Sequence, residues 1–145
     1  MEELIQQLKV LQATAFSLYL KAHNFHWNIT GPNFIQYHSF LNTVYDQVHG
    51  TVDDYAEHIR ALKAFAPGSL TRFAELTKIA DEVAIPTARN MLAKLASDNA
   101  ILLNELRTGA DIAQKANEHG VLNFLEGLID DHEKLQWMLV SFEEA

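Results

Sequence analysis

Apolar residues recur at alternating spacings of three and four along most of this 145-residue chain, and prolines interrupt the pattern at three places. That spacing puts the apolar side chains on one face of an α-helix. A proline inside a helix removes an amide donor and clashes with the preceding turn. Pro32, Pro67 and Pro86 therefore divide the chain into separate helical segments, and the sequence predicts an all-α fold.

The segments differ in length, and so do the connections between them. Ser69 is a predicted N-cap for a short helix, and Gly120 is a predicted C-cap for a long one, because these residue types suit those positions. The pattern predicts four long helices over residues 1–28, 34–62, 86–119 and 121–142, and a short extra helix over residues 70–79.

The connection between the second and third long helices is a crossover of about 20 residues, whereas the other two connections are short. A four-helix bundle with one long crossover has the ferritin-like connectivity. We therefore expect a ferritin-like four-helix bundle with a short extra helix in the long crossover. We expect residues 1–145 to form a single domain, because the length suits one core.

Composition narrows the classes of function. The chain has 11 basic and 19 acidic residues, a net charge of −8, and such a surface repels nucleic acid and anionic membranes. The absence of cysteine excludes a disulfide framework, a thiolate zinc site and a cysteine nucleophile. No stretch is long and apolar enough to cross a bilayer. We expect a cytoplasmic protein with no membrane partner.

Two histidines and two carboxylates are the strongest candidates for a metal site. His26 ends the first helix and His38 begins the second, so the hairpin brings them to similar heights. Asp53 and Glu57 lie one turn apart on one face of the second helix, which suits joint binding of one metal. Imidazole nitrogen together with carboxylate oxygen suits iron, manganese or zinc.

The distance along the second helix separates these two pairs. Asp53 comes fifteen positions after His38, which is about 22 Å of helix at about 1.5 Å per residue. Metal–ligand bonds of about 2 Å cannot bridge that gap. Either the pairs serve two separate sites, or a two-fold-related chain supplies the other half, which would form the site twice.

A metal site inside the bundle has a different sequence signature. Such a site uses Glu-x-x-His on two of the helices. The sequence contains no Glu-x-x-His, and residues 46–49, which read DQVH, are the nearest approach. The sequence therefore excludes the usual site inside the bundle.

Residues 23–34 read HNFHWNITGPNF, with His38 shortly after them and DDYAE at residues 53–57. This combination closely resembles the signature of the Dps family, the miniferritins or DNA-protecting proteins of starved cells. The resemblance extends to the fourth long helix, where residues 132–138 read HEKLQWM. It covers nearly the whole chain.

The resemblance implies a hollow dodecameric shell that oxidises Fe(II), usually with hydrogen peroxide, otherwise with O2, and stores the ferric product. Removing both reactants protects DNA from oxidative damage. In this family the ferroxidase centre lies between two-fold-related subunits. By resemblance, His26 and His38 would come from one subunit, and Asp53 and Glu57 from the other, with Glu57 reaching a second, weaker iron. Trp27 would lie beside the centre and take up oxidising equivalents.

Two of the departures from the family pattern bear on metal binding and on DNA binding. Asn42 stands where the family usually has aspartate, and an amide oxygen is a weaker ligand than a carboxylate. Asp46, one turn further on, is a candidate substitute. The family members that bind DNA often use a lysine-rich N-terminal tail, whereas Lys9 is the first basic residue here. We therefore expect no direct DNA binding.

Asn42 also sustains an alternative hypothesis. In that alternative the same shell has an impaired ferroxidase centre and acts as a passive particle, binding iron or zinc or associating with DNA.

A few residues are predicted to serve the fold. His132 falls on the apolar face of the last helix and is expected to be a core or interface histidine with its polar atoms satisfied. His23 is expected to be packed or hydrogen-bonded, and Trp137 and Met138 are expected in the core.

Overall fold

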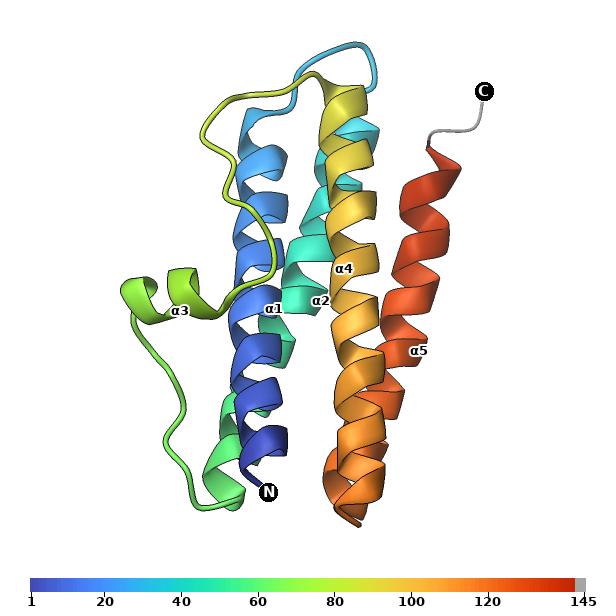
Figure 1. Cartoon of the computed structure of the whole chain (residues 1–145). Coiled ribbons are helices and arrows are strands. Elements are labelled where there is room, and N and C mark those ends of the chain that lie inside the picture. Colours follow the sequence, from blue (N-terminus) through green and yellow to red (C-terminus); the bar gives the residue numbers. More distant parts are fainter. Residues whose placement is uncertain (143–145) are drawn as a thin grey trace.

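The computed structural model describes residues 1–142. It consists of helices, and the described residues contain no strand, which confirms the all-α prediction (Figure 1). The helices are α1 (Glu2–Asn28), α2 (Phe34–Ala61), α3 (Leu70–Leu76), α4 (Ala88–Lys115) and α5 (His119–Ser141).

The connectivity is the predicted ferritin-like one. α1 and α2 form one antiparallel hairpin, and α4 and α5 form a second (Figure 1). The long crossover passes along the outside of α1 and carries α3, so α4 starts at the end of the bundle where α2 also starts. α1 is the central element, because it packs against α2, α3 and α4.

The core runs the full length of the bundle, and each long helix contributes a stripe of fully buried side chains. Burying one such side chain stabilises the fold by about 1.5–3 kcal/mol. The stripes include Leu8, Leu11, Leu18 and Phe25 from α1, Leu41, Val48 and Ile59 from α2, Leu95, Leu102 and Leu106 from α4, and Leu125 and Leu139 from α5.

The turn between α4 and α5 differs from the prediction. α4 ends at Lys115, and Gly120 lies in the first turn of α5 instead of capping α4. Asn117 makes the turn with a φ of 58°. Asparagine tolerates this left-handed conformation better than most residues, so the turn does not need glycine. α4 begins at Ala88, just after Pro86, and the side chain of Thr87 caps it.

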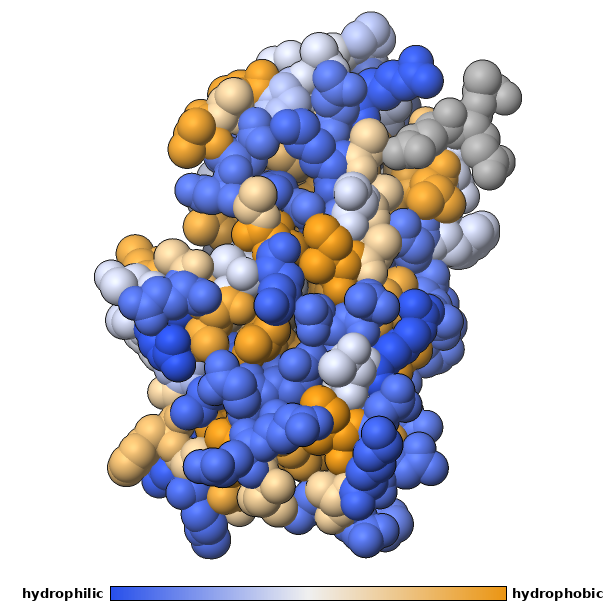
Figure 2. Space-filling model, in the orientation of Figure 1, coloured by the Kyte–Doolittle hydropathy of each residue, from blue (hydrophilic) through white to orange (hydrophobic). Residues whose placement is uncertain are grey.

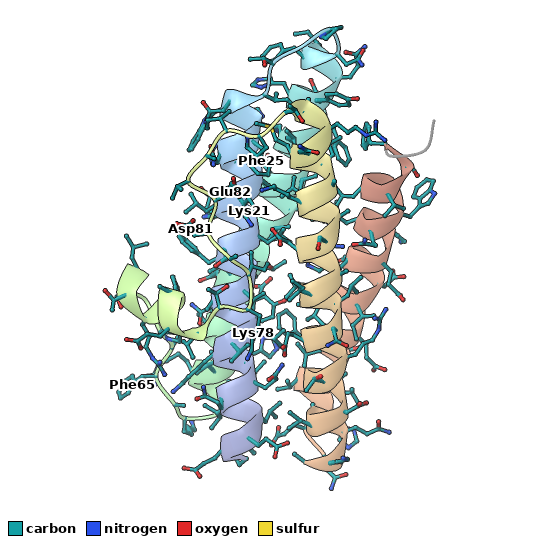
Figure 3. All side chains as sticks on the ribbon, turned by 45° about the horizontal axis from the view of Figure 1, so that its top comes forward. Lys21, Phe25, Phe65, Lys78, Asp81 and Glu82 are labelled. Atoms are coloured by element: carbon teal, nitrogen blue, oxygen red, sulfur yellow. The ribbon has the colours of Figure 1, made fainter. Side chains whose placement is uncertain are left out.

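The buried Lys21 side chain ties α1 both to α4 and to the crossover. Lys21 on α1 donates from Nζ to the Asp98 carboxylate on α4 at 2.7 Å and to the Ala80 carbonyl at 2.6 Å. Figure 3 shows Lys21 beneath the part of the crossover that carries Asp81 and Glu82. Ser69 caps α3 by accepting from the Arg72 amide, as predicted, although α3 is shorter than expected.

Two predictions for the last helix have opposite outcomes. His132 is 1% exposed, and its Nδ1 lies 2.6 Å from the Asn99 side-chain oxygen, which confirms a satisfied core histidine. Trp137, in contrast, is 68% exposed, so its prediction as a core residue was wrong. It lies on the outer side of α5 with Met138 half-buried beside it.

Candidate metal centre

The α1–α2 hairpin brings His26 and His38 into contact. Their rings stack with centroids 3.8 Å apart and planes 17° from parallel. Nδ1 of His26 lies 2.8 Å from the His38 carbonyl, and Nδ1 of His38 lies 2.8 Å from the His26 carbonyl. A carbonyl only accepts, so each Nδ1 carries the hydrogen and each Nε2 keeps its lone pair. A histidine so fixed binds a metal through Nε2.

The conformation of the loop between α1 and α2 allows the two histidines to meet. Gly31 has a φ of 123°, a conformation that side chains with a Cβ rarely adopt. Ile29 just before it is buried in the core and anchors the loop. His26 is buried in the last turn of α1, whereas the adjacent Trp27 is 59% exposed.

A carboxylate cluster lies near the other end of α2. Asp53, Asp54 and Glu57 are exposed, and each offers one oxygen within 4.8 Å of the others. A hydrogen bond with Asp53 raises the pKa of Glu57, and the negative charges of Asp53 and Asp54 raise it further. A bound cation would relieve this repulsion. Asp54 was not among the predicted ligands, although it is the second residue of the DDYAE motif.

The four predicted ligands do not meet within one chain. α2 is unbroken from Phe34 to Ala61, so His38 and Asp53 are about 22 Å apart along it. In the described part of the chain, the one group of three or more metal-binding side chains contains no histidine. The structure therefore presents two separate groups of candidate ligands, a nitrogen pair and an oxygen cluster, which we call the candidate half-sites.

Both polar atoms of the Asn42 side chain already make hydrogen bonds. Its Oδ1 accepts a hydrogen bond from the Tyr45 hydroxyl at 2.7 Å, and its Nδ2 donates to Asp46 at 3.3 Å. Binding a metal through Asn42 would require the Tyr45 hydroxyl to turn away or share the oxygen. Both candidate auxiliary ligands thus belong to one hydrogen-bonded group on α2.

Aromatic rings surround the histidine pair. His23 stacks on Trp27, with centroids 3.9 Å apart, and on Tyr45, with centroids 3.8 Å apart and planes 8° from parallel. Its Nδ1 is 3.0 Å from the Tyr19 hydroxyl, which confirms that His23 is packed and hydrogen-bonded. Partial burial lowers the pKa of His23, and the nearby His26 lowers it further.

Comparisons with known proteins agree with this fold. The ferritin-like domain family matches residues 5–144. A DNA protection during starvation protein from Brevibacillus brevis is 31% identical over 127 residues, covering 88% of this chain and 85% of the relative. The crystal structure of a Dps protein from Bacillus brevis is 29% identical, with a TM-score of 0.95 and coverage of 99% and 96%.

The crystal structure of a Dps protein from Vibrio cholerae is 25% identical, with a TM-score of 0.95 and coverage of 99% of this chain and 90% of that one. It is described as a member of a broad superfamily of ferritin-like diiron-carboxylate proteins.

The matched domain and the bundle with its single crossover define a ferritin-like protein. Within that class, the chain belongs to the Dps family. Membership supports iron storage and DNA protection as roles at the level of the family, and iron as the metal. Among residues 1–142, no helix combines the length and apolar character needed to span a membrane.

Proposed function

We propose that this protein oxidises Fe(II) with hydrogen peroxide, or with O2, at sites shared between two-fold-related protomers. A dodecameric cytoplasmic shell then stores the ferric product. The observation that carries this proposal is the separation of the half-sites. The His26–His38 pair and the Asp53–Glu57 carboxylates lie about 22 Å apart on one straight helix.

Symmetry supplies the missing half of each site. In an antiparallel pairing of two α2 helices about a two-fold axis near Asp46, His26 and His38 face the partner's Asp53 and the partner's Glu57. The same contact forms the site twice. Each site then has two neutral imidazoles and two carboxylates, a donor set suited to iron.

Exposed apolar side chains give a reason for the chains to associate. They lie on α1 and along the crossover, and Figure 2 shows apolar side chains reaching the surface on the side where α3 and the crossover lie. Exposed apolar surface of this kind marks interaction sites. The exposed residues are Leu20, Trp27, Phe65, Leu70, Val83 and Ile85.

The iron is the substrate of the proposed reaction. Two Fe(II) ions each give one electron to a hydrogen peroxide molecule, the O–O bond breaks, and two protons complete two water molecules. Both electrons reach the peroxide in one site, so free hydroxyl radical is not released. Asp53 and Glu57 attract Fe(II) and stabilise the higher charge of Fe(III).

The first test measures ferric absorbance after Fe(II) addition, with and without hydrogen peroxide. We expect oxidation well above the protein-free rate, and we expect His38→Ala and Asp53→Asn to reduce it towards that rate. Asp130→Asn, on the exposed face of α5, is the charge-matched control and should leave the rate unchanged. A wild-type rate equal to that of buffer would contradict the proposal.

Mixed shells test whether the site is shared. One chain carries His26→Ala and His38→Ala, and the other carries Asp53→Asn and Glu57→Gln. Each variant alone has no intact site. If the chains associate at random about two-fold axes, co-assembly restores about a quarter of the sites. A site contained within one chain would gain nothing from mixing, and that result would exclude the shared site.

The engagement of Asn42 by Tyr45 and Asp46 favours a second candidate function. With a weak second metal position, the shell would hold iron or zinc passively, or would associate with DNA, without oxidising Fe(II). The ferric-absorbance assay separates the two candidate functions. A passive particle binds metal at the half-sites, but Fe(II) oxidation then proceeds at the rate measured in buffer without protein.

A further inference from the structure

The hydroxyl of Tyr45 is bonded to the one oxygen through which Asn42 could bind a metal. An ionised carboxylate only accepts hydrogen bonds, so the Asp46 carboxylate, 3.3 Å from Nδ2 of Asn42, fixes the orientation of the Asn42 amide. The amide oxygen therefore faces Tyr45, and the Tyr45 hydroxyl donates to it at 2.7 Å. That length is optimal for a hydroxyl donor.

Asn42 lies beside the histidine pair. It follows His38 by four positions on α2, and residues four apart are neighbours on one face of a helix. An amide oxygen has two lone pairs, and the Tyr45 hydroxyl uses one of them. The hydroxyl proton carries partial positive charge, so it repels a cation that approaches the same oxygen.

The packing of the Tyr45 ring keeps its hydroxyl in place. One face of the ring stacks on His23, with centroids 3.8 Å apart and planes 8° from parallel. The ring also meets His26 in an edge-to-face contact, with centroids 5.0 Å apart. An ion at Asn42 must therefore share the oxygen with the hydroxyl, or the hydroxyl proton must turn away and lose its hydrogen bond. Both outcomes weaken the binding of that ion.

We propose that Tyr45 regulates the second metal position of the shared site, by keeping the Asn42 oxygen in a hydrogen bond that an incoming ion has to share or break. The inference rests on the proposed function, because it takes Asn42 to lie at that site. The first ion binds at Nε2 of His26 and His38. Its affinity should not depend on the Tyr45 hydroxyl, which donates to Asn42.

The second position decides when oxidation begins. Two-electron reduction of hydrogen peroxide needs both ions, since each Fe(II) gives one electron. The affinity of the weaker position therefore sets the Fe(II) concentration at which oxidation starts. Removing the Tyr45 hydroxyl should lower that concentration about five-fold, the factor that corresponds to one ordinary hydrogen bond. Tyr45 thus delays oxidation until Fe(II) is abundant.

Tyr45→Phe is the test, because phenylalanine keeps the ring that stacks on His23 and removes only the hydroxyl. Zn(II) is titrated calorimetrically into the metal-free assembled protein, since it suits nitrogen and oxygen donors and has no redox reaction. We expect the weaker binding step to tighten about five-fold and the tighter step to stay unchanged. Tyr37→Phe, in another half-buried tyrosine of α2, whose ring packs on Phe142, should change neither step.

The titration has outcomes on both sides. A second binding step that appears only in Tyr45→Phe would also support the proposal. A weaker step that is equal in the wild type and the variant, or that is missing from both, would overturn it. An equal change in both steps would overturn it too, because the effect would then lie on the histidine pair. Zn(II) binding does not depend on Fe(II) oxidation, so a protein that fails to oxidise Fe(II) still answers this question.

The Asn42→Asp background shows whether the hydroxyl acts through the oxygen at position 42. A carboxylate has two oxygens, so one can accept from Tyr45 while the other binds the ion. Tyr45→Phe should therefore change the weaker step by less than about two-fold in this background, because the two substitutions are coupled. An equal gain in both backgrounds would show that the hydroxyl does not act through Asn42, and would overturn the proposal.

The kinetics of Fe(II) oxidation give a readout that a loss of packing would not imitate. The Fe(II) concentration at half-maximal rate should fall in Tyr45→Phe, while the maximal rate stays at the wild-type value. A loosened histidine pair would instead lower the maximal rate. Circular dichroism melting verifies that each variant is folded. A half-maximal concentration equal to that of the wild type would exclude the regulatory role.

Discussion

At the scale of single residues, His132 is a titratable group in the bundle core. Burial lowers its pKa to about 4. The unfolded chain takes up a proton near pH 6.5, whereas the folded protein does so only near pH 4. Above about pH 7 the residue is neutral in both states. As the pH falls from 6.5 to 4, the unfolded state gains protons first, so stability decreases.

The predicted loss is about 3 kcal/mol of unfolding free energy between pH 7 and pH 4, at about 1.4 kcal/mol per pKa unit. Urea denaturation at several pH values measures it. His132→Gln is the comparison variant, because glutamine does not titrate and the carboxylates respond alike in both proteins. If the difference between the two proteins stays constant with pH, the assignment to His132 is wrong.

Asn42 stands where the resemblance to the Dps family leads us to expect an aspartate. Asn42→Asp should bind a second metal more tightly and oxidise Fe(II) faster, because a carboxylate is a charged ligand and can still accept from the Tyr45 hydroxyl. Calorimetric metal titration and initial oxidation rates measure the two effects. Asn104→Asp, on the exposed face of α4, controls for added charge. Unchanged second-metal affinity would show that Asn42 is not the limiting ligand.

At the scale of helices, two glycines inside helices should respond oppositely to alanine. A Cβ on Gly127 in α5 meets nothing within 4 Å, so Gly127→Ala should raise the unfolding free energy by up to about 1 kcal/mol. A Cβ on Gly109 in α4 would lie 3.1 Å from Leu125 and 3.2 Å from Leu11. That crowding should cancel the gain. Thermal melting of both variants measures the difference, and equal gains would contradict it.

Helix boundaries were predictable wherever a residue strongly prefers one position relative to a helix. The proline divisions and the Ser69 cap are examples, because sterics and side-chain hydrogen bonding act within a few residues. The α4–α5 turn was less predictable, since Asn117 and Gly120 can both adopt a left-handed conformation, and the structure uses Asn117. Trp137 was misjudged because its position beside the apolar stripe of α5 turns it outward.

At the scale of the whole molecule, helical geometry predicted that the histidine pair and the carboxylates lie far apart in one chain, and their meeting across two chains remains our proposal. The distance between His38 and Asp53 follows from the rise of a helix. The reciprocal hydrogen bonds of His26 and His38 could not be predicted, since they depend on the exact path of the loop between α1 and α2.

The assembly state tests the proposal at this scale. We expect light scattering or native mass spectrometry to give the mass of a dodecamer, because a shared site requires symmetry-related chains and a closed shell is needed for storage. Loading with iron should then raise the density of the particle without dissociating it. A monomer in solution would leave the histidine pair without its carboxylates.

The mutual bonding of the two histidines has a consequence for how metal is captured. Each imidazole is held by a hydrogen bond to a main-chain carbonyl of the other helix. The two rings therefore lose their rotational freedom when the α1–α2 hairpin folds. In the site that we propose, the rings are therefore fixed before the ion arrives, and binding loses less entropy than it would with two mobile side chains. The short loop between α1 and α2, which carries no ligand atom, would therefore contribute to the metal affinity of the proposed site.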